Sequence, residues 1–376
     1  MKKAIITLIM LCPLIPLGAQ TGDDSGTHRG TYQDRREYAR ARVEKIERKL
    51  IGESSQGVEL RVHLTVLDGP KKGEKHVSVY RGEDDLPKEM FYRQGDSVFI
   101  GISKTGGVDA VEYVSIYDVD NTAGLAVIGL LLVITIIAVG RLRGALAMVS
   151  LLATVVLIFH VLIPQTLRGR SPLPIAVGIS LFAIAVTIPI IMGFRKKTLS
   201  AVLGASTGVI IAMALALFAG WLMHLSGIVT NEMLTVFYAS GVEINLRGLA
   251  LAGVVIAALG AIMDVCISIS SATEEIFRVH PEISRVEAFR SVFTVSSDIL
   301  GATVNTLLFA YVGSALPVVL LIAMRLEPGM PLMLVFNYNP VLSELVKSAI
   351  GCIGMFLAMP VTAFISVELH GRKQGG

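Results

Sequence analysis

The sequence contains few cysteines, few aromatic residues and little charge. Its 376 residues include three cysteines and one tryptophan, and only 17% are Asp, Glu, Lys or Arg. Residues 21–120 contain no cysteine, so this part of the chain has neither a disulfide framework nor a cysteine-based zinc site. The net charge of +3 is small and its basic residues form short clusters, so we expect no nucleic-acid partner.

Common catalytic motifs are also missing. The chain has no Walker A sequence, no GxSxG and no HExxH, and no group of His, Asp and Glu has the spacing of metal ligands. These absences argue against ATP-driven pumping and against the common hydrolases. We therefore expect a protein that is not an enzyme and that holds neither a metal nor another cofactor.

Apolar residues are abundant and gathered in long blocks. They make up 53% of the chain and give a mean hydropathy of +0.67, which is too apolar for a soluble globular enzyme. Seven blocks each approach the twenty or so residues that a bilayer requires: 123–140, 144–163, 173–193, 199–225, 247–271, 299–324 and 347–368. The sequence thus predicts a mainly α membrane protein, with a bundle of about seven transmembrane helices over residues 123–368 and a tail over 369–376.

The N-terminus resembles an export signal. Lys2 and Lys3 precede an apolar stretch over residues 4–17, followed by the small residues Gly18 and Ala19. Residues 1–20 are therefore predicted to be a signal peptide or an uncleaved signal anchor. Either version exports the segment that follows.

Residues 21–122 have the composition of a water-soluble module with an N-terminal tether. Alternating apolar and polar residues predict five short strands, at 38–46, 58–69, 75–82, 96–104 and 109–120, with a turn at residues 68–70. The first of these segments also suits a helix. Five strands with glycine-rich turns predict a small antiparallel barrel of OB-like or SH3-like type.

The distribution of basic residues predicts the orientation. With residues 21–122 outside the cell, the gaps 141–143, 194–198 and 272–298 and the C-terminal tail lie on the cytoplasmic side. They contain most of the basic residues next to the membrane: Arg141, Arg143, Arg195, Lys196, Lys197, Arg278, Arg285, Arg290, Arg372 and Lys373. The C-terminus is therefore expected to be cytoplasmic.

A polar stripe runs along the segment "GAIMDVCISISSATEEI" at residues 260–276. Asp264, Ser268, Ser271 and Glu275 recur at the spacing that places them on one face of a helix. A carboxylate inside a bilayer costs a few kcal/mol, so it faces a bundle interior, water or a partner. One alternative is a protonated Asp264 that only holds two helices together.

A second stripe follows in residues 294–313, where Thr294, Asp298, Gly301 and Asn305 share a face. Asp298 also suits a helix cap at the membrane surface, and Asn305 a structural bond to a neighbouring helix. Further on, the spacing of Glu344 and Lys347 predicts an ion pair within one helix.

Small residues predict close contacts between helices. We expect such contacts at "GASTG" (204–208) and "GCIG" (351–354), and at Gly260, Gly301 and Gly313.

Residues 260–276, 298–317 ("DILGATVNTLLFAYVGSALP") and 351–366 ("GCIGMFLAMPVTAFIS") resemble the YibE/F-like family of bacterial multi-pass membrane proteins. Gly260, Asp264, Ser268, Ser271 and Glu275 carry the most specific part of the likeness. Ser297 and Cys266 differ from the residues usual in the family. The resemblance implies a location in the bacterial inner membrane and a permease role.

Three functions fit these features. In the first, a transporter moves a small solute or ion along a polar path lined by Asp264, Ser268, Ser271 and Glu275 on one side and by Asp298 and Asn305 on the other. In the second, a receptor or scaffold protein uses its exported module to bind a protein or peptide. An intramembrane aspartyl protease using both Asp residues ranks below these, because the expected sequence context is missing.

Overall fold

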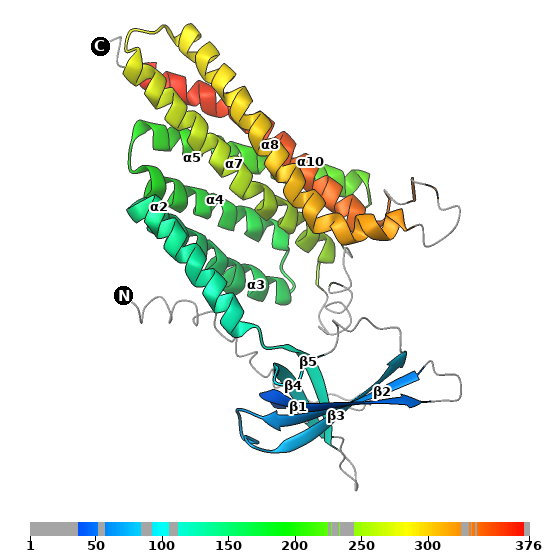
Figure 1. The fold of residues 1–376 in the computed structure, drawn as a ribbon. Coiled ribbons are helices and arrows are strands. Elements are labelled where there is room, and N and C mark those ends of the chain that lie inside the picture. The colour runs from blue at the N-terminus through cyan, green and yellow to red at the C-terminus, as the bar shows by residue number, and fades with distance from the viewer. Residues whose placement is uncertain are drawn as a thin grey trace. The chain divides into compact units, whose positions relative to one another are not determined.

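The computed structural model describes residues 37–51, 57–83, 92–104, 112–224, 227, 233, 244–324, 331, 333–334 and 337–371. The predicted signal segment and tether, over residues 1–36, lie outside the described residues. The chain divides between Thr135 and Ile136 into two compact units. The first contains the sheet and the second contains most of the helices (Figure 1).

The N-terminal unit is one antiparallel sheet with the strand order β3-β2-β1-β4-β5. Its strands are β1 (Glu37–Ile51), β2 (Gly57–Val66), β3 (Lys75–Glu83), β4 (Ser97–Lys104) and β5 (Glu112–Val119). All five predicted strands are confirmed, and the first segment is a strand rather than a helix. The predicted turn is also confirmed, with Gly69 at a φ of 81° that suits glycine.

The sheet is curved into a half-barrel around a small apolar core. Register shifts in β1 between Val43 and Lys45, and in β4 between Phe99 and Ile100, bend the strands. Ser78 Oγ of β3 donates a hydrogen bond of 2.8 Å to the carbonyl oxygen of Val114 in β5, which links the two edge strands. The core consists of Ala41, Val43, Val62, Leu64, Val66, Val98, Ile100 and Ile102.

Within the part of the chain that the structure describes, seven helical segments are long and apolar enough to cross a membrane, as predicted. Helix α2 (Thr122–Leu157) contains the first of these segments and part of the second. The two are separated at Arg141, where the backbone leaves the helical conformation at a φ of 49° and a ψ of −136°. The π-helix η2 (Ile158–Leu162) and α3 (Ile163–Leu167) complete the second span. The others are α4 (Pro172–Met192), α5 (Lys196–Leu222), α7 (Leu246–Val279), α8 (Arg285–Ala323) and α10 (Asn339–Gly371).

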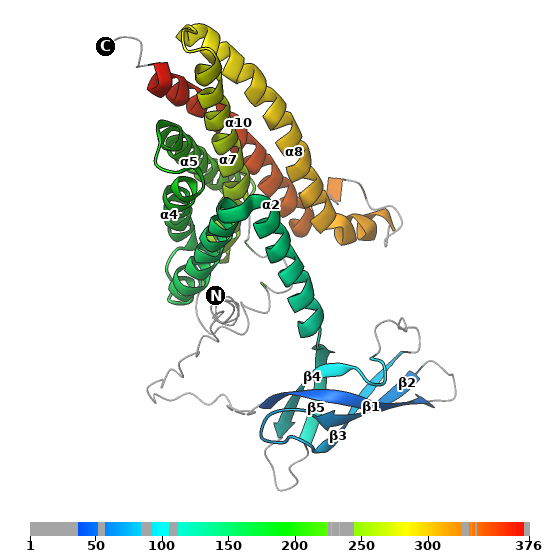
Figure 2. The same ribbon diagram turned by 60° about the vertical axis from the view of Figure 1, so that its left-hand side comes forward.

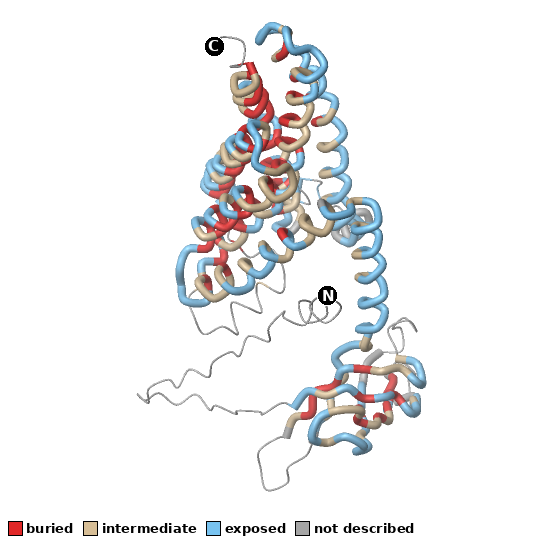
Figure 3. The backbone as a smooth tube through the Cα atoms, turned by 90° about the vertical axis from the view of Figure 1, so that its left-hand side faces the viewer, coloured by how far each residue is buried: buried red, intermediate tan, exposed pale blue. Residues whose placement is uncertain are grey.

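The centre of the helical unit is formed by α5, α7 and α10, which pack closely against one another. Figure 3 shows the buried residues gathered along these helices, whereas most of α8 is exposed. Helix α4 packs against α5 and α7, and α8 packs against α7 and α10. The core therefore draws on α4 and α5 as well as on the later helices.

Helices α7 and α8 form an antiparallel hairpin with a short turn at Pro281 (Figure 2). The backbone N–H of Glu287 donates to Ser284 Oγ at 3.3 Å, and the N–H of Ser284 donates to Glu287 Oε2 at 3.4 Å. This reciprocal pair is a capping box, which fixes the start of α8. Residues 272–298, predicted as a gap between two apolar blocks, therefore lie mostly in the ends of the long helices α7 and α8.

The C-terminal boundary also differs slightly from the prediction. Helix α10 continues to Gly371, three residues beyond the predicted end of the bundle at residue 368. The ion pair predicted within this helix is present, with Lys347 Nζ 2.7 Å from Glu344 Oε1.

Candidate functional site

The polar stripe of α7 lies opposite its packed face. Ile262 and Cys266 are fully buried against α5 and α10. Asp264 lies two residues from each of them, about 200° around the helix, and its side chain is exposed. Ser268 and Ser271 are half-buried beside it. The stripe is thus a real feature of the fold, and it borders the packed core rather than entering it.

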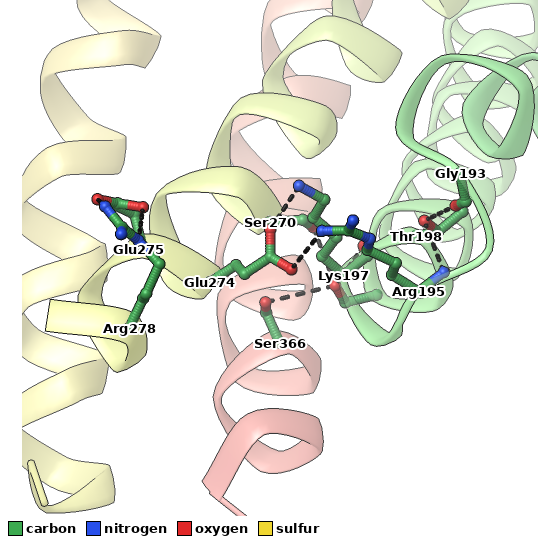
Figure 4. A network of polar contacts seen from close by, with 10 residues as sticks. Gly193, Arg195, Lys197, Thr198, Ser270, Glu274, Glu275, Arg278 and Ser366 are labelled. Carbon is green, nitrogen blue, oxygen red and sulfur yellow. Dashed lines mark hydrogen bonds and ion pairs between the residues drawn. The ribbon is translucent and has the colours of Figure 1, made fainter. Parts of the chain in front are cut away.

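Glu275, at the end of this stripe, is engaged with a neighbour on the same helix. Arg278 Nε donates to Glu275 Oε2 at 2.8 Å, and Arg278 Nη2 donates to Glu275 Oε1. Figure 4 shows this pair on the side of α7 away from α5. A bidentate contact of this kind holds the carboxylate in its charged form.

The polar stripe of α8 also lies opposite the buried side of its helix. Ser296 and Leu300 are buried, and Asp298 lies between them on the opposite side of the helix, where it is exposed. Asn305 is also exposed. Among the described residues, neither Asp298 nor Asn305 has a hydrogen-bond or ion-pair partner, and the same holds for Asp264.

The hairpin places the two aspartates at one level. Asp264 precedes the end of α7 at Val279 by 15 residues. Asp298 follows the start of α8 at Arg285 by 13 residues. At a rise of about 1.5 Å per residue, both lie about 20 Å from the hairpin turn along their helices. The structure thus brings the two stripes onto adjacent antiparallel helices at one depth, without a bond between the carboxyl groups.

The close helix contacts are made by glycines other than the three predicted as Gly260, Gly301 and Gly313. A Cβ atom built on any of those three meets no described atom within 4 Å, because each faces away from the packed helices. The contacts predicted at "GASTG" and "GCIG" are confirmed. A Cβ on Gly204 would overlap Thr362 Oγ1, and one on Gly208 would lie 2.7 Å from Ile262 Cγ2.

A hydroxyl cluster joins α5, α7 and α10 near one end of the bundle (Figure 4). Ser200, Ser270 and Ser366 are fully buried, with Ser200 Oγ 3.0 Å from Ser270 Oγ and 3.3 Å from Ser366 Oγ. Each hydroxyl therefore has a partner in an otherwise apolar core. This cluster was not predicted from the sequence, because isolated serines in apolar helices carry no signal beyond their small size.

An ion pair lies over this cluster at the helix ends. Lys197 Nζ is 2.5 Å from Glu274 Oε2, and Arg195 Nη1 is 3.8 Å from Glu274 Oε1. Figure 4 shows Glu274 reaching from α7 toward the beginning of α5, on the side opposite Glu275. Glu274 and Glu275 are neighbours in the sequence, yet Glu274 pairs with the start of α5 whereas Glu275 pairs within α7. The pairing of Glu274 was not predicted from the sequence.

Comparison with protein families decides the assignment. The YibE/F-like protein model matches residues 128–372, which is most of the chain and all of the described part of the helical unit. The chain belongs to the YibE/F-like family. No curated protein and no solved structure was found to match it.

The YibE/F-like match covers both polar stripes, the close glycine contacts and the hydroxyl cluster. It ends at residue 372, next to the end of α10, and begins within α2. The half-barrel lies outside the matched residues.

Proposed function

We propose that this protein is a permease of the bacterial cytoplasmic membrane, with a polar path along the outer face of the α7–α8 hairpin. The half-barrel module would be extracytoplasmic and the C-terminus cytoplasmic, as the distribution of basic residues favours. The carrying observation is that Asp264 and Asp298 are exposed, unpaired among the described residues and level with each other on adjacent helices.

The carboxyl groups of Asp264 and Asp298 need water or a protein partner. An ionisable group facing acyl chains costs about 2.5–3.5 kcal/mol on insertion scales, so such groups face water or protein. Helices α5 and α10 contact the opposite side of α7 and leave the Asp264 face open. A hydrated path along this face would satisfy Asp264, Ser268 and Ser271 together, and a carboxyl group that gains and loses a proton would couple solute movement to protons.

Thiol labelling tests whether the face is wet without knowledge of the solute. Cysteine would be placed at Ser268 and Asn305, in a background in which Cys12, Cys266 and Cys352 are replaced by alanine. Matched controls on the same helices are Ile262→Cys and Leu300→Cys, which lie on the buried sides of α7 and α8. In intact membranes, a charged thiol reagent should label the first two positions and spare the controls.

Failure to label either polar position would contradict a hydrated path. The coupling role is tested separately with purified protein in vesicles that contain a pH-sensitive dye. Asp264→Asn should abolish proton movement with the protein otherwise folded, whereas proton movement equal to that of the parent would remove Asp264 from the coupling.

A second candidate function is partner binding by the half-barrel. A hollow of about 370 Å³ lies beside β3 and β5 and is lined by Ile46, Leu60, Val62, Ser78, Val79, Tyr80, Tyr92, Val114, Ser115 and Ile116. Burial, followed by the negative charge of Asp118, raises the pKa of Tyr92. An extended peptide or another apolar ligand would suit this hollow.

Two variants separate these functions in cells. Under the permease proposal, Asp264→Asn abolishes function in the full-length chain. Under the receptor proposal, deletion of residues 21–120 abolishes function whereas Asp264→Asn is silent. Correct membrane insertion of each variant has to be verified first.

A further inference from the structure

A separate hollow of about 640 Å³ lies where α5 begins and where α7 and α10 end. Its lining residues are Arg195, Lys196, Glu274, Phe277, Arg278, Pro281 and His370. None of these belongs to the polar stripes of α7 and α8. The hollow therefore needs an explanation of its own.

The charge around this hollow is predominantly positive. Glu274, which is the acidic residue of the lining, is already paired with Lys197. Lys196 Nζ donates one hydrogen bond, of 2.8 Å, to the carbonyl oxygen of Leu369. An ammonium group has three N–H donors, so two remain for a further acceptor. Arg195 is 3.8 Å from Glu274 and its side chain is 68% exposed. Both cations can thus take a further anionic partner.

The beginning of α5 adds donors at the same place. Helix α5 starts at Lys196, with Arg195 in an extended conformation at its cap. The N–H of Thr198 donates to the carbonyl oxygen of Arg195 at 3.0 Å, which leaves the N–H groups of Lys196 and Lys197 without an acceptor among the described residues. The N-terminal end of the helix also carries a partial positive charge. A phosphate group bound here would meet these N–H groups together with the side chains of Arg195 and Lys196.

The other side of the hollow is apolar. The Phe277 and His370 rings stack with centroids 5.9 Å apart and an interplanar angle of 17°, and Pro281 lies nearby. A cationic rim beside aromatic and aliphatic surface at the ends of spanning helices matches the boundary between lipid headgroups and acyl chains. By the distribution of basic residues, this end is the cytoplasmic one, where anionic lipids attract Lys and Arg.

We propose that this hollow binds a phosphate group through Arg195, Lys196 and the N-terminus of α5, supplied by an anionic phospholipid headgroup or by a soluble phosphate. The bound group would tie the beginning of α5 to the ends of α7 and α10, over the buried hydroxyl cluster. It is independent of the proposed path, because it uses none of the polar-stripe residues.

Native mass spectrometry of the purified full-length chain tests the proposal. The protein in detergent would be titrated with phosphatidylglycerol, with phosphatidylcholine as the zwitterionic reference. The test variant is Arg195→Gln with Lys196→Gln. The matched control is Arg168→Gln with Arg170→Gln, which removes two exposed arginines in the turn between α3 and α4.

We expect phosphatidylglycerol to bind the parent more tightly than phosphatidylcholine, and the test variant to lose about tenfold or more in affinity. The control variant should bind as the parent does. Equal losses in both variants, or unchanged binding in the test variant, would overturn the proposal. If the double variant does not fold, each single variant is measured in its place.

Inorganic phosphate distinguishes the source of the anion. Its effect on thermal unfolding is compared with that of chloride at equal ionic strength. A stabilisation by phosphate that the test variant loses identifies a soluble anion as a ligand, whereas binding of lipid alone identifies the headgroup. If neither probe depends on Arg195 and Lys196, the site does not exist.

Discussion

The contact between α5 and α10 makes a sharp prediction about Gly204. A Cβ atom at this position would overlap Thr362 Oγ1 and would lie 2.8 Å from Thr362 Cβ and 3.1 Å from its Cα. Thr362 is fully buried and donates to the carbonyl oxygen of Ala358 at 2.7 Å, so it has little freedom to move aside. Gly204→Ala should therefore force the two helices apart.

The expected magnitude follows from two opposing terms. Overpacking a well-packed core costs about 1–3 kcal/mol, and replacing glycine by alanine inside a helix returns about 0.5–1 kcal/mol. Because the Cβ would overlap an atom outright, the overpacking cost should lie in the upper part of its range, at about 2–3 kcal/mol. We therefore expect Gly204→Ala to lower the free energy of unfolding by about 1–2.5 kcal/mol. The additional change Thr362→Ala should recover part of this loss, because it removes the overlapping oxygen.

Trp221 provides the assay. It is the only tryptophan in the sequence and lies on α5, the helix that carries Gly204. The unfolding transition followed by its fluorescence, on heating or in denaturing detergent, should occur under milder conditions in Gly204→Ala than in the parent. The matched control is Gly301→Ala on α8, where a Cβ meets no described atom within 4 Å and only the helix-propensity gain is expected. Equal stability of Gly204→Ala and the parent would refute the packing argument.

Three further predictions concern other parts of the chain. In the half-barrel, hydrogen bonds from the backbone N–H and guanidinium of Arg40 lower the pKa of Asp68. The pairing therefore stabilises the fold above the pKa of Asp68 in the unfolded chain, which is about 4, and this stabilisation is lost as the pH falls through the lower pKa of the folded state. Asp68→Asn should reduce the acid sensitivity of hydrogen exchange in β1. Ile100→Ala should destabilise the half-barrel by about 2–4 kcal/mol in the same exchange measurement, whereas the neighbouring exposed Phe99→Ala should cost little. Lys197→Gln should destabilise the helical unit by about 1–2 kcal/mol in the Trp221 assay, because Glu274 then keeps only the longer contact to Arg195, and unchanged stability would contradict this.

Much of the fold follows from local patterns in the sequence. Alternation of apolar residues predicted the strands, and long apolar blocks predicted the spans, because both patterns reflect burial over consecutive residues. The stripe of Asp264, Ser268, Ser271 and Glu275 was predictable for the same reason, since helical periodicity alone places these residues on one face. A family resemblance based on the same residues agrees with the match over residues 128–372.

The choice of helix contacts was not fully predictable. Gly204 and Gly260 are both small residues in apolar helices, yet Gly204 lies against α10, whereas a Cβ on Gly260 would meet no described atom within 4 Å. Which face of a helix is packed depends on its rotation toward its neighbours, and this rotation is set by the sum of many tertiary contacts. The hydroxyl cluster and the pairing of Glu274 with Lys197 were missed for the same reason, because they join residues 70 or more positions apart.

The exposed aspartates lead to one remaining test of how the α7–α8 face is covered. If water lines this face, Gly301→Ala should leave stability unchanged or slightly raised, and cysteine at Asn305 should react with a charged reagent. If another protein surface packs against it, the added methyl group at Gly301 should disrupt that contact and cysteine at Asn305 should be protected. Since Gly301 and Asn305 are one helical turn apart on α8, the two measurements probe one patch, and only the pairing of a tolerated methyl group with a reactive thiol supports the permease.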